Sequence, residues 1–362
     1  MAELPLSQRK SEHLKLVAEG GVAHGGSTLL EDVHLLHQAL PELDVEDVRL
    51  ETTFFGKTIA SPLMITSMTG GAEYAGKLNH GFARVAAQMN IPFAVGSQRV
   101  MIRHPETLAD FAVRGEIPDG VLLGNIGAVQ LLEHSAEEIA ELAKSIEADG
   151  LCVHLNVAQE LMQVDGNRHF RGLLEGIDRL MEVLDGNILV KETGTGMSPQ
   201  ALQQLHTIGV PYVDVSGAGG TSWTKVESLR EANGPLQESG HLFGDWGIPT
   251  SVSVAAAKAI FGETAVIIAS GGIHTGLDVA RSIALGADVV GFAREVLLQF
   301  LEGNEEGAIR YINRLNKDLK IAMLLCGAED VASMQRVPRV IGGDLRQWLD
   351  TLGFLDGDYI ER

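Results

Sequence analysis

The chain has 362 residues, and its 28 Lys+Arg against 48 Asp+Glu give a formal net charge of −20. Hydrophobic residues make up 45% of it, enough for a large core, which excludes disordered and fibrous proteins. The acidic charge argues against nucleic acids and anionic membranes as partners, because both require clustered positive charge. The two cysteines, Cys152 and Cys326, are too few for a disulfide framework or a cysteine zinc site.

The first twenty residues contain no apolar signal region, and no segment reaches about 18 uninterrupted apolar residues. We therefore expect a soluble cytoplasmic protein. No low-complexity tract or Pro/Ser-rich linker divides the chain, so we expect one domain over residues 1–362.

Short apolar runs rich in Val, Ile and Leu recur along the middle of the chain. Because they lack polar alternation, they predict strands buried on both faces, as in a parallel sheet. The predicted strands are Leu63–Thr66, Phe93–Val95, Val121–Leu123, Leu151–Leu155, Ile188–Val190, Tyr212–Val215, Val266–Ala269 and Val289–Phe292.

Helical patterns lie between most of these strands. Ser135–Glu147 carries Ala, Leu and Ile at helical spacing, and Thr275–Leu285 begins with a capping threonine that Asp278 follows three residues later. Eight strand–helix units in series predict an α/β protein with a closed (β/α)8 TIM barrel, an open doubly wound sheet being the alternative.

We expect the barrel core at about residues 62–302, flanked by helical extensions at 1–61 and 303–362. The second extension contains an amphipathic helix, Ala308–Cys326. The glycine-rich connection from Gly217 to Pro249 is unusually long and carries Trp223 and Trp246, which suggests a lid over the catalytic face.

Polar residues follow every predicted strand, and such positions form the active site of a barrel. Together these residues predict a polar, glycine-lined cavity at the carboxyl ends of the strands. The sharpest signal is the segment 265–297, where a strand leads through Gly271 and Gly272 into a helix and the next strand ends in Gly-Phe-Ala-Arg. This pattern favours a phosphate site, since glycine backbone and a helix N-terminus attract anions; turn-forming glycines are the alternative.

Three further features carry candidate chemistry. Lys191 ends a buried strand and could form a Schiff base, hold an anion, or pair with Glu192 or another carboxylate. Glu160 is either a ligand of a hard cation or a helix-surface residue. The segment Arg9–His13 is a basic cluster in an acidic protein, either exposed surface or an anion clamp.

These motifs, taken together and in order, resemble the type 2, flavin-dependent isopentenyl-diphosphate isomerases. The resemblance covers most of the chain, and RKxxH combined with HLNxxQE is its most specific part. Its segments are RKxxH (9–13), SMTGG (67–71), AVGSQR (94–99), GNIG (124–127), HLNVAQE (154–160), VKETGTGMS (190–198), DVSGAGGTSW (214–223), WGIPT (246–250) and ASGGIHTGLDVA (269–280).

The resemblance implies an FMN-binding barrel that interconverts isopentenyl and dimethylallyl diphosphate in isoprenoid biosynthesis. It also implies reduced FMN, Mg²⁺, NAD(P)H as the reductant, and a tetramer or octamer. It assigns FMN binding to Ser67, Met68, Thr69, Ser97, Asn125, Lys191, Ser216, Thr221, Gly271, Gly272, His274, Ala293 and Arg294. It assigns substrate binding to Arg9, Lys10, His13, Ser97, Gln98, Arg99, Asn156 and Gln159.

The family's chemistry explains the remaining assignments. Moving the double bond requires protonation of an unactivated alkene, which a reduced flavin assists through its electron-rich face and its ring nitrogens. Gln159 and His154 are the candidates for assisting proton transfer, and Glu160 for binding Mg²⁺. His274 stands where relatives often have Arg, which leaves the pH dependence of phosphate binding open. The alternatives are an FMN-dependent 2-hydroxy-acid oxidoreductase and a non-catalytic barrel.

Overall fold

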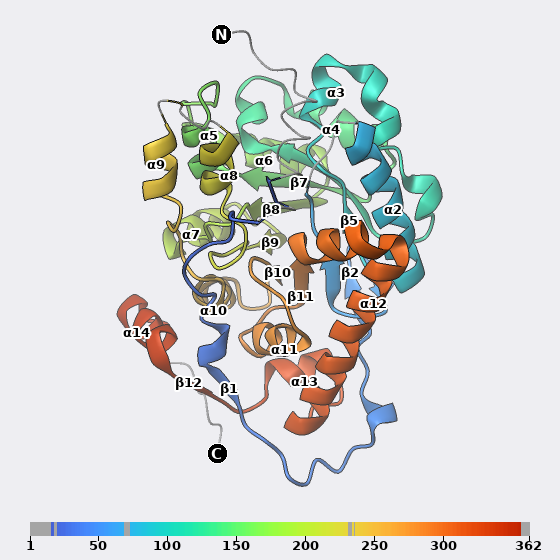
Figure 1. The fold of residues 1–362 in the computed structure, drawn as a ribbon, viewed down its shortest axis with the longest axis vertical. Coiled ribbons are helices and arrows are strands. Elements are labelled where there is room, and N and C mark those ends of the chain that lie inside the picture. Colours follow the sequence, from blue (N-terminus) through green and yellow to red (C-terminus); the bar gives the residue numbers. More distant parts are fainter. Residues whose placement is uncertain (1–15, 18–19, 69–72, 231–233, 235, 356–362) are drawn as a thin grey trace.

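Eight parallel strands close into a barrel surrounded by helices (Figure 1). The computed structural model describes residues 16–17, 20–68, 73–230, 234 and 236–355. The strand order around the barrel is β10-β11-β4-β5-β6-β7-β8-β9, which confirms the predicted (β/α)8 architecture. The strands are β4 (Leu63–Ile65), β5 (Phe93–Ala94), β6 (Leu122–Gly127), β7 (Gly150–Leu155), β8 (Ile188–Glu192), β9 (Tyr212–Asp214), β10 (Val266–Ala269) and β11 (Val289–Phe292).

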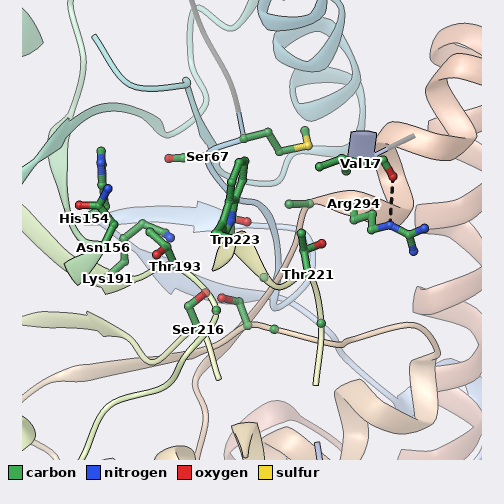
Figure 2. Close-up of a pocket in the computed structure, with 18 of the residues that line it drawn as sticks. Val17, Ser67, His154, Asn156, Lys191, Thr193, Ser216, Thr221, Trp223 and Arg294 are labelled. Carbon is green, nitrogen blue, oxygen red and sulfur yellow. Dashed lines mark hydrogen bonds between the residues drawn. The ribbon is translucent and has the colours of Figure 1, made fainter. Parts of the chain in front are cut away.

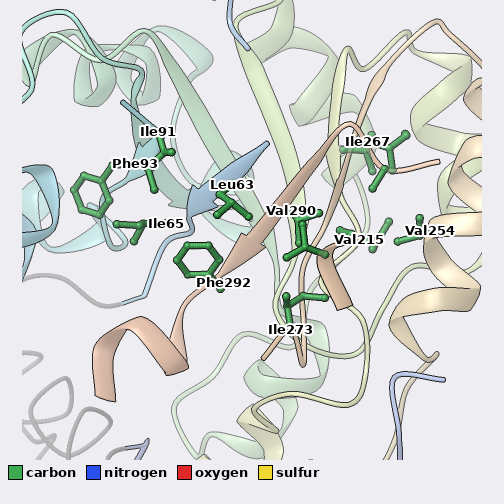
Figure 3. Close-up of a cluster of buried hydrophobic side chains, with 14 of the residues drawn as sticks. Leu63, Ile65, Ile91, Phe93, Val215, Val254, Ile267, Ile273, Val290 and Phe292 are labelled. Atoms are coloured by element: carbon green, nitrogen blue, oxygen red, sulfur yellow. The ribbon is translucent and has the colours of Figure 1, made fainter. Parts of the chain in front are cut away.

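Alternate residues of each strand pack in two different cores. Leu63 and Ile65 belong to the large cluster between strands and helices, whereas Met64 belongs to a smaller cluster inside the barrel. Figure 3 shows part of the outer cluster, where Val254 of a surrounding helix packs near Ile267 of β10. Both faces of a strand are thus buried, which is why the strands appear as uninterrupted apolar runs.

A hairpin closes the amino-terminal end of the barrel. Its strands are β2 (Thr52–Phe54) and β3 (Lys57–Ile59), and Phe54 and Ile59 belong to the inner cluster. The ring of Phe55 stacks on Tyr212, with ring centroids 4.0 Å apart. The barrel is therefore filled at this end, and its open mouth lies at the carboxyl ends of the strands.

The helices that surround the barrel alternate with its strands. The predicted cap at Thr275 is confirmed, since Thr275 forms a capping box with Asp278; Ser135 forms a further capping box with Glu138. The surrounding helices are α2 (Glu73–Met89), α4 (Ala136–Ser145), α6 (Leu173–Val183), α7 (Pro199–Thr207), α10 (Thr250–Phe261), α11 (Gly276–Ala284) and α12 (Arg294–Cys326). Shorter helices are α3 (Arg99–Arg103), α5 (Val157–Met162), α8 (Trp223–Arg230), α9 (Gln237–Leu242), α13 (Val331–Gln335) and α14 (Gly343–Leu352).

Three details differ from, or refine, the sequence-based expectation. In the first extension residues 16–17 are helical, whereas residues 20–61 consist of 3-10 turns and short strands; there β1 (Val33–Leu35) pairs antiparallel with β12 (Arg339–Ile341) of the second extension. The expected tail helix is the second half of α12, which kinks at Gly303 and Asn304. The long connection after β9 contains α8 and α9.

Five short 3-10 helices complete the described structure. They are η1 (Leu30–Asp32), η2 (Val45–Asp47), η3 (Pro105–Asp110), η4 (Arg114–Glu116) and η5 (Ala128–Leu132). Among the helices of the described ranges, none is both long enough and apolar enough to span a bilayer.

Candidate active site

A cavity of about 280 Å³ occupies the mouth of the barrel, and residues from all eight strand ends line it. The barrel's own alternation explains its polarity. Cys152 and Leu189 face the inner core, and the next inward positions along their strands, His154 and Lys191, line the cavity. Apolar residues thus fill the barrel below a layer of polar residues at its mouth.

The structure brings most of the predicted site residues to this one cavity. Those that line it are Ser67, Met68, Ser97, Arg99, Asn125, His154, Asn156, Gln159, Glu160, Lys191, Ser216, Thr221, Gly271, Gly272, His274, Ala293 and Arg294. Figure 2 shows the two ends of the cavity. One end is lined by His154, Asn156, Lys191 and Thr193, and the other end is lined by Val17 and Arg294. The predicted residues Arg9, Lys10, His13 and Thr69 lie outside the described residues.

Gln98, a predicted substrate ligand, is not among the cavity's lining residues. Its side chain is fully buried, and its Nε2 donates to the carbonyl of Leu142 at 2.8 Å. Its Oε1 accepts the backbone N–H of Asn125 at 3.0 Å. Because both ends of the amide are bonded inside the protein, Gln98 holds the strand end that carries Asn125 instead of facing a ligand.

Glycines shape the end of the cavity near the loop after β10. Gly271 and Gly272 have φ of 96° and 73°, a conformation that favours glycine. A Cβ on Gly271 would lie 2.1 Å from the carbonyl oxygen of Gly217, and a Cβ on Gly272 would lie 2.4 Å from Cγ2 of Thr28. The loop therefore passes so close to its neighbours that side chains are excluded, and its backbone lies exposed to the cavity.

Charged side chains gather at this glycine-lined end. Arg294 begins α12, and its Nε donates to the carbonyl of Val17 at 3.3 Å (Figure 2). His274 and Arg294 both contact the same oxygen of Glu295, at 3.3 and 3.2 Å. The hydrogen bond to Glu295 raises the pKa of His274 above its ordinary value. This end thus combines two basic side chains with an exposed backbone turn, as an anion site requires.

The floor of the cavity contains Lys191 next to two buried carboxylates. Lys191 is paired in register with Asp214 of β9, and its Nζ donates to the carbonyl of Glu192 at 2.6 Å. Burial raises the pKa of Asp214 and of Glu192. Asp214 accepts the backbone N–H of Ser216 at 3.1 Å, and Ser216 has a positive φ of 36°. The sequence alternative of a Lys191–Glu192 side-chain pair is not formed.

The opposite end carries a connected set of amides. Nδ1 of His154 lies 2.8 Å from Oδ1 of Asn125. Asn156 donates to Oε1 of Gln159 at 3.3 Å and to Oε1 of Glu160 at 3.1 Å. Glu160 is buried and its other oxygen accepts the backbone N–H of Asn167 at 2.7 Å. It is therefore not the helix-surface glutamate of the alternative interpretation.

Glu227 of α8 orients these amides from outside the lining of the cavity. This residue was not identified from the sequence. It is fully buried, and its Oε1 accepts Nε2 of Gln159 and Nε2 of Gln163, each at 2.8 Å. Arg230 lies 3.3 Å from its other oxygen. No local pattern distinguishes Glu227 from an exposed helical glutamate, because the two glutamines that donate to it are more than sixty residues away in the chain.

The chain is similar to a protein family, to individual relatives and to solved structures. A family model described as FMN-dependent dehydrogenase matches residues 156–338. An isopentenyl-diphosphate delta-isomerase of Methanopyrus kandleri is 40% identical over 350 residues, which is 96% of this chain and 95% of the relative. A Synechococcus protein of the same name is 43% identical, over 92% of this chain and 96% of the relative.

Solved structures show the same fold at low sequence identity. A mandelate oxidase with (S)-2-phenylpropionate has a TM-score of 0.64 and 16% identity, covering 94% of this chain and 99% of that one. A flavocytochrome b2 variant with sulfite bound has a TM-score of 0.64 and 14% identity, covering 90% of this chain and 81% of that one.

Proposed function

The chain belongs to the isopentenyl-diphosphate delta-isomerase family, and we propose that it interconverts isopentenyl and dimethylallyl diphosphate with reduced FMN bound. The single observation that carries the proposal is the two-ended cavity. One end is a glycine-lined anion site, and the other presents His154, Gln159 and Glu160. A bound cofactor and a bound substrate each have their own set of side chains there.

FMN fits the residues that line this cavity. Gly271 and Gly272 carry no side chains and line the cavity, so their backbone would be accessible to the phosphate group, and Arg294 adds positive charge. Lys191 and Ser216 also line the cavity and would hold the ring and ribityl chain. When bound, reduced FMN supplies an electron-rich ring whose nitrogens exchange protons.

The chain's own residues would position the reacting alkene. The amide oxygen of Asn125 accepts from His154, so the proton of the neutral imidazole lies on Nδ1. The bond from Gln159 to the buried Glu227 restricts rotation of the Gln159 amide at the cavity wall. Such fixed dipoles favour charge that develops in the transition state, because they need no reorganisation during the reaction. His154 and Gln159 would thus assist the two proton transfers.

We assign Mg²⁺ binding to Glu160. Mg²⁺ commonly uses one or two protein carboxylates and completes its shell with water and phosphate oxygens. Glu160 lines the cavity and is fixed by Asn156 and Asn167. The substrate diphosphate would supply further oxygens, and the basic segment Arg9–His13 together with Arg99 would neutralise the remaining charge.

Several finer features remain part of this proposal. NAD(P)H is the expected reductant of the flavin, the cytoplasm the expected location, and a homo-oligomer of four or eight chains the expected assembly. The hydroxy-acid oxidoreductase alternative would need a histidine base and a substrate-binding arginine on the segment that leads into β10. Among the described lining residues, the segment between β9 and β10 contributes Ser216, Gly219, Gly220, Thr221 and Trp223, none of them basic.

Proton NMR tests the proposal directly. Isopentenyl diphosphate is incubated without oxygen in D₂O with the protein, Mg²⁺ and either reduced or oxidised FMN. Deuterated dimethylallyl diphosphate in the reduced sample alone is the expected result. No conversion in either sample, by folded protein shown to hold FMN, would overturn the isomerase assignment.

A further inference from the structure

One carboxylate oxygen joins two basic side chains at the glycine-lined end of the cavity. Oε1 of Glu295 lies 3.3 Å from Nδ1 of His274 and 3.2 Å from Nη1 of Arg294. All three residues line the cavity, and we call them the phosphate-end triad. Of the three, only the imidazole changes its charge near neutral pH.

The other groups around His274 fix its backbone. Asp278 of α11 accepts the N–H of His274 at 3.2 Å. Tyr311 of α12 donates its hydroxyl to the carbonyl of His274 at 3.4 Å, and Arg314 lies over the Tyr311 ring, 5.3 Å from its centroid. Burial raises the pKa of Tyr311, so its hydroxyl stays protonated. The backbone of His274 is therefore held in place by groups of both α11 and α12.

We propose that FMN binding is linked to protonation of His274, whose imidazolium is held by Glu295 and binds the phosphate group. Under this proposal Glu295 is a positioning residue that keeps His274 charged, although its own charge would repel a phosphate. The inference rests on the FMN-binding part of the proposed function and does not require isomerisation.

The sign of the linkage follows from the charges of the triad. With His274 protonated, two cations and one anion leave a net charge of 2 − 1 = +1. With His274 neutral, Arg294 and Glu295 cancel and the net charge is zero. The hydrogen bond to Glu295 raises the pKa of His274, so the +1 state persists above the pH at which an ordinary histidine titrates. FMN should bind tightly below that pKa, lose affinity as pH rises through it, and take up protons on binding.

The test measures the Kd of FMN from quenching of flavin fluorescence between pH 6.5 and 9. This range lies above the second ionisation of a phosphate monoester, which is near pH 6. For the unaltered protein we expect the Kd to rise with pH by at most about tenfold per unit. Riboflavin, which has no phosphate, is the control ligand, and its Kd should lack this rise.

Three variants test the contributions of His274 and Glu295 to FMN binding. His274→Arg keeps a permanent cation, so FMN should bind tightly with no such rise in Kd, whereas His274→Gln should bind weakly across the range. Glu295→Gln removes the partner that raises the pKa of His274, so the rise in Kd should move to lower pH. Titration calorimetry in buffers of different ionisation enthalpy should show proton uptake for the unaltered protein and much less for both His274 variants.

Two results would overturn the inference. One is an unchanged pH profile in His274→Gln, and the other is the same profile for riboflavin as for FMN. If the proposed function fails and the linkage holds, the protein shows a pH-dependent Kd for FMN but forms no dimethylallyl diphosphate. An isomerase whose Kd for FMN is constant over the range would retain its function and refute the linkage. Absence of FMN binding at every pH would refute both.

Discussion

Replacing Glu227 tests whether a residue outside the motifs orients the catalytic amide. In Glu227→Gln the side chain keeps its shape but loses its charge. Gln159 and Gln163 both donate to one oxygen of Glu227, and Arg230 lies 3.3 Å from the other. A glutamine presents only one oxygen, so its NH₂ group must face either Arg230 or the two amides. At least one of these contacts is therefore lost.

The size of the effect follows from the type of contact. A hydrogen bond to a charged group contributes about 1.5–3 kcal/mol. If this whole free energy is lost from the stabilisation of the transition state by Gln159, kcat should fall by about 10- to 100-fold. KM should change little, because the substrate diphosphate is held elsewhere. Breaking a buried pair with Arg230, whose side chain is 7% exposed, should also lower stability by about 3 kcal/mol or more.

Steady-state isomerisation by the loaded enzyme, measured by NMR, gives kcat for a double-mutant cycle. If Glu227 acts through Gln159, the pair Glu227→Gln with Gln159→Leu should be no slower than Gln159→Leu alone. Gln163→Met is the matched control, because it removes the other donor to the same oxygen and should leave kcat within about threefold. Fully additive losses in the cycle, with folding shown intact by circular dichroism, would refute this role of Glu227.

Three shorter predictions address other parts of the site. Glu160→Gln should raise the Mg²⁺ concentration needed for half-maximal rate, and an unchanged Mg²⁺ titration would remove Glu160 from the metal site. Arg9→Ala should raise KM for the diphosphate by about tenfold or more while the Kd of FMN stays constant; equal losses would indicate a folding defect. Gly272→Ala should abolish FMN binding, because its Cβ would lie 2.4 Å from Cγ2 of Thr28 at a φ of 73°. The control Gly353→Ala, in the left-handed helical region with φ of 76° and no atom within 4 Å of the added Cβ, should lose about 1 kcal/mol of stability and retain FMN binding; normal FMN binding by Gly272→Ala would show that this loop does not form the phosphate site.

The barrel strands were predictable because a strand that is buried on both faces has an uninterrupted apolar sequence. The strand β7 begins one residue before the predicted Leu151 and ends at the predicted residue. The prediction for β6 was shorter than the strand, since Asn125 and two glycines interrupt the apolar run while pairing with β7 continues through Gly127. Hydrogen bonding thus extends a strand past the point where hydrophobicity ends.

The helix α8 within the connection after β9 and the internal hydrogen bonds of Gln98 were not predictable from local patterns. The buried residues of α8 are Thr224, Val226, Glu227 and Ser228, so this helix lacks the apolar stripe by which helices are recognised. Gln98 follows a strand like the lining residues do, yet it bonds to Leu142, which is 44 residues away. In both cases the determining partners are distant in sequence and only the fold brings them together.

The acidic composition of the chain also needs a structural explanation, because a diphosphate substrate must approach a protein of net charge −20. The three buried carboxylates behind the cavity are all occupied. Glu192 accepts the backbone N–H groups of residues 193 and 194 at 2.6 Å, Asp214 accepts Ser270 Oγ at 2.6 Å, and Glu227 accepts two glutamines. Each of these three carboxylates thus orients donors within the wall instead of facing the ligand. Lys191, Arg294 and Arg99 line the cavity itself, together with Glu160, the proposed Mg²⁺ ligand, and Glu295, which contacts His274 and Arg294. Net charge therefore excludes a polyanion bound across the surface, but a small diphosphate meets only the local field of the cavity.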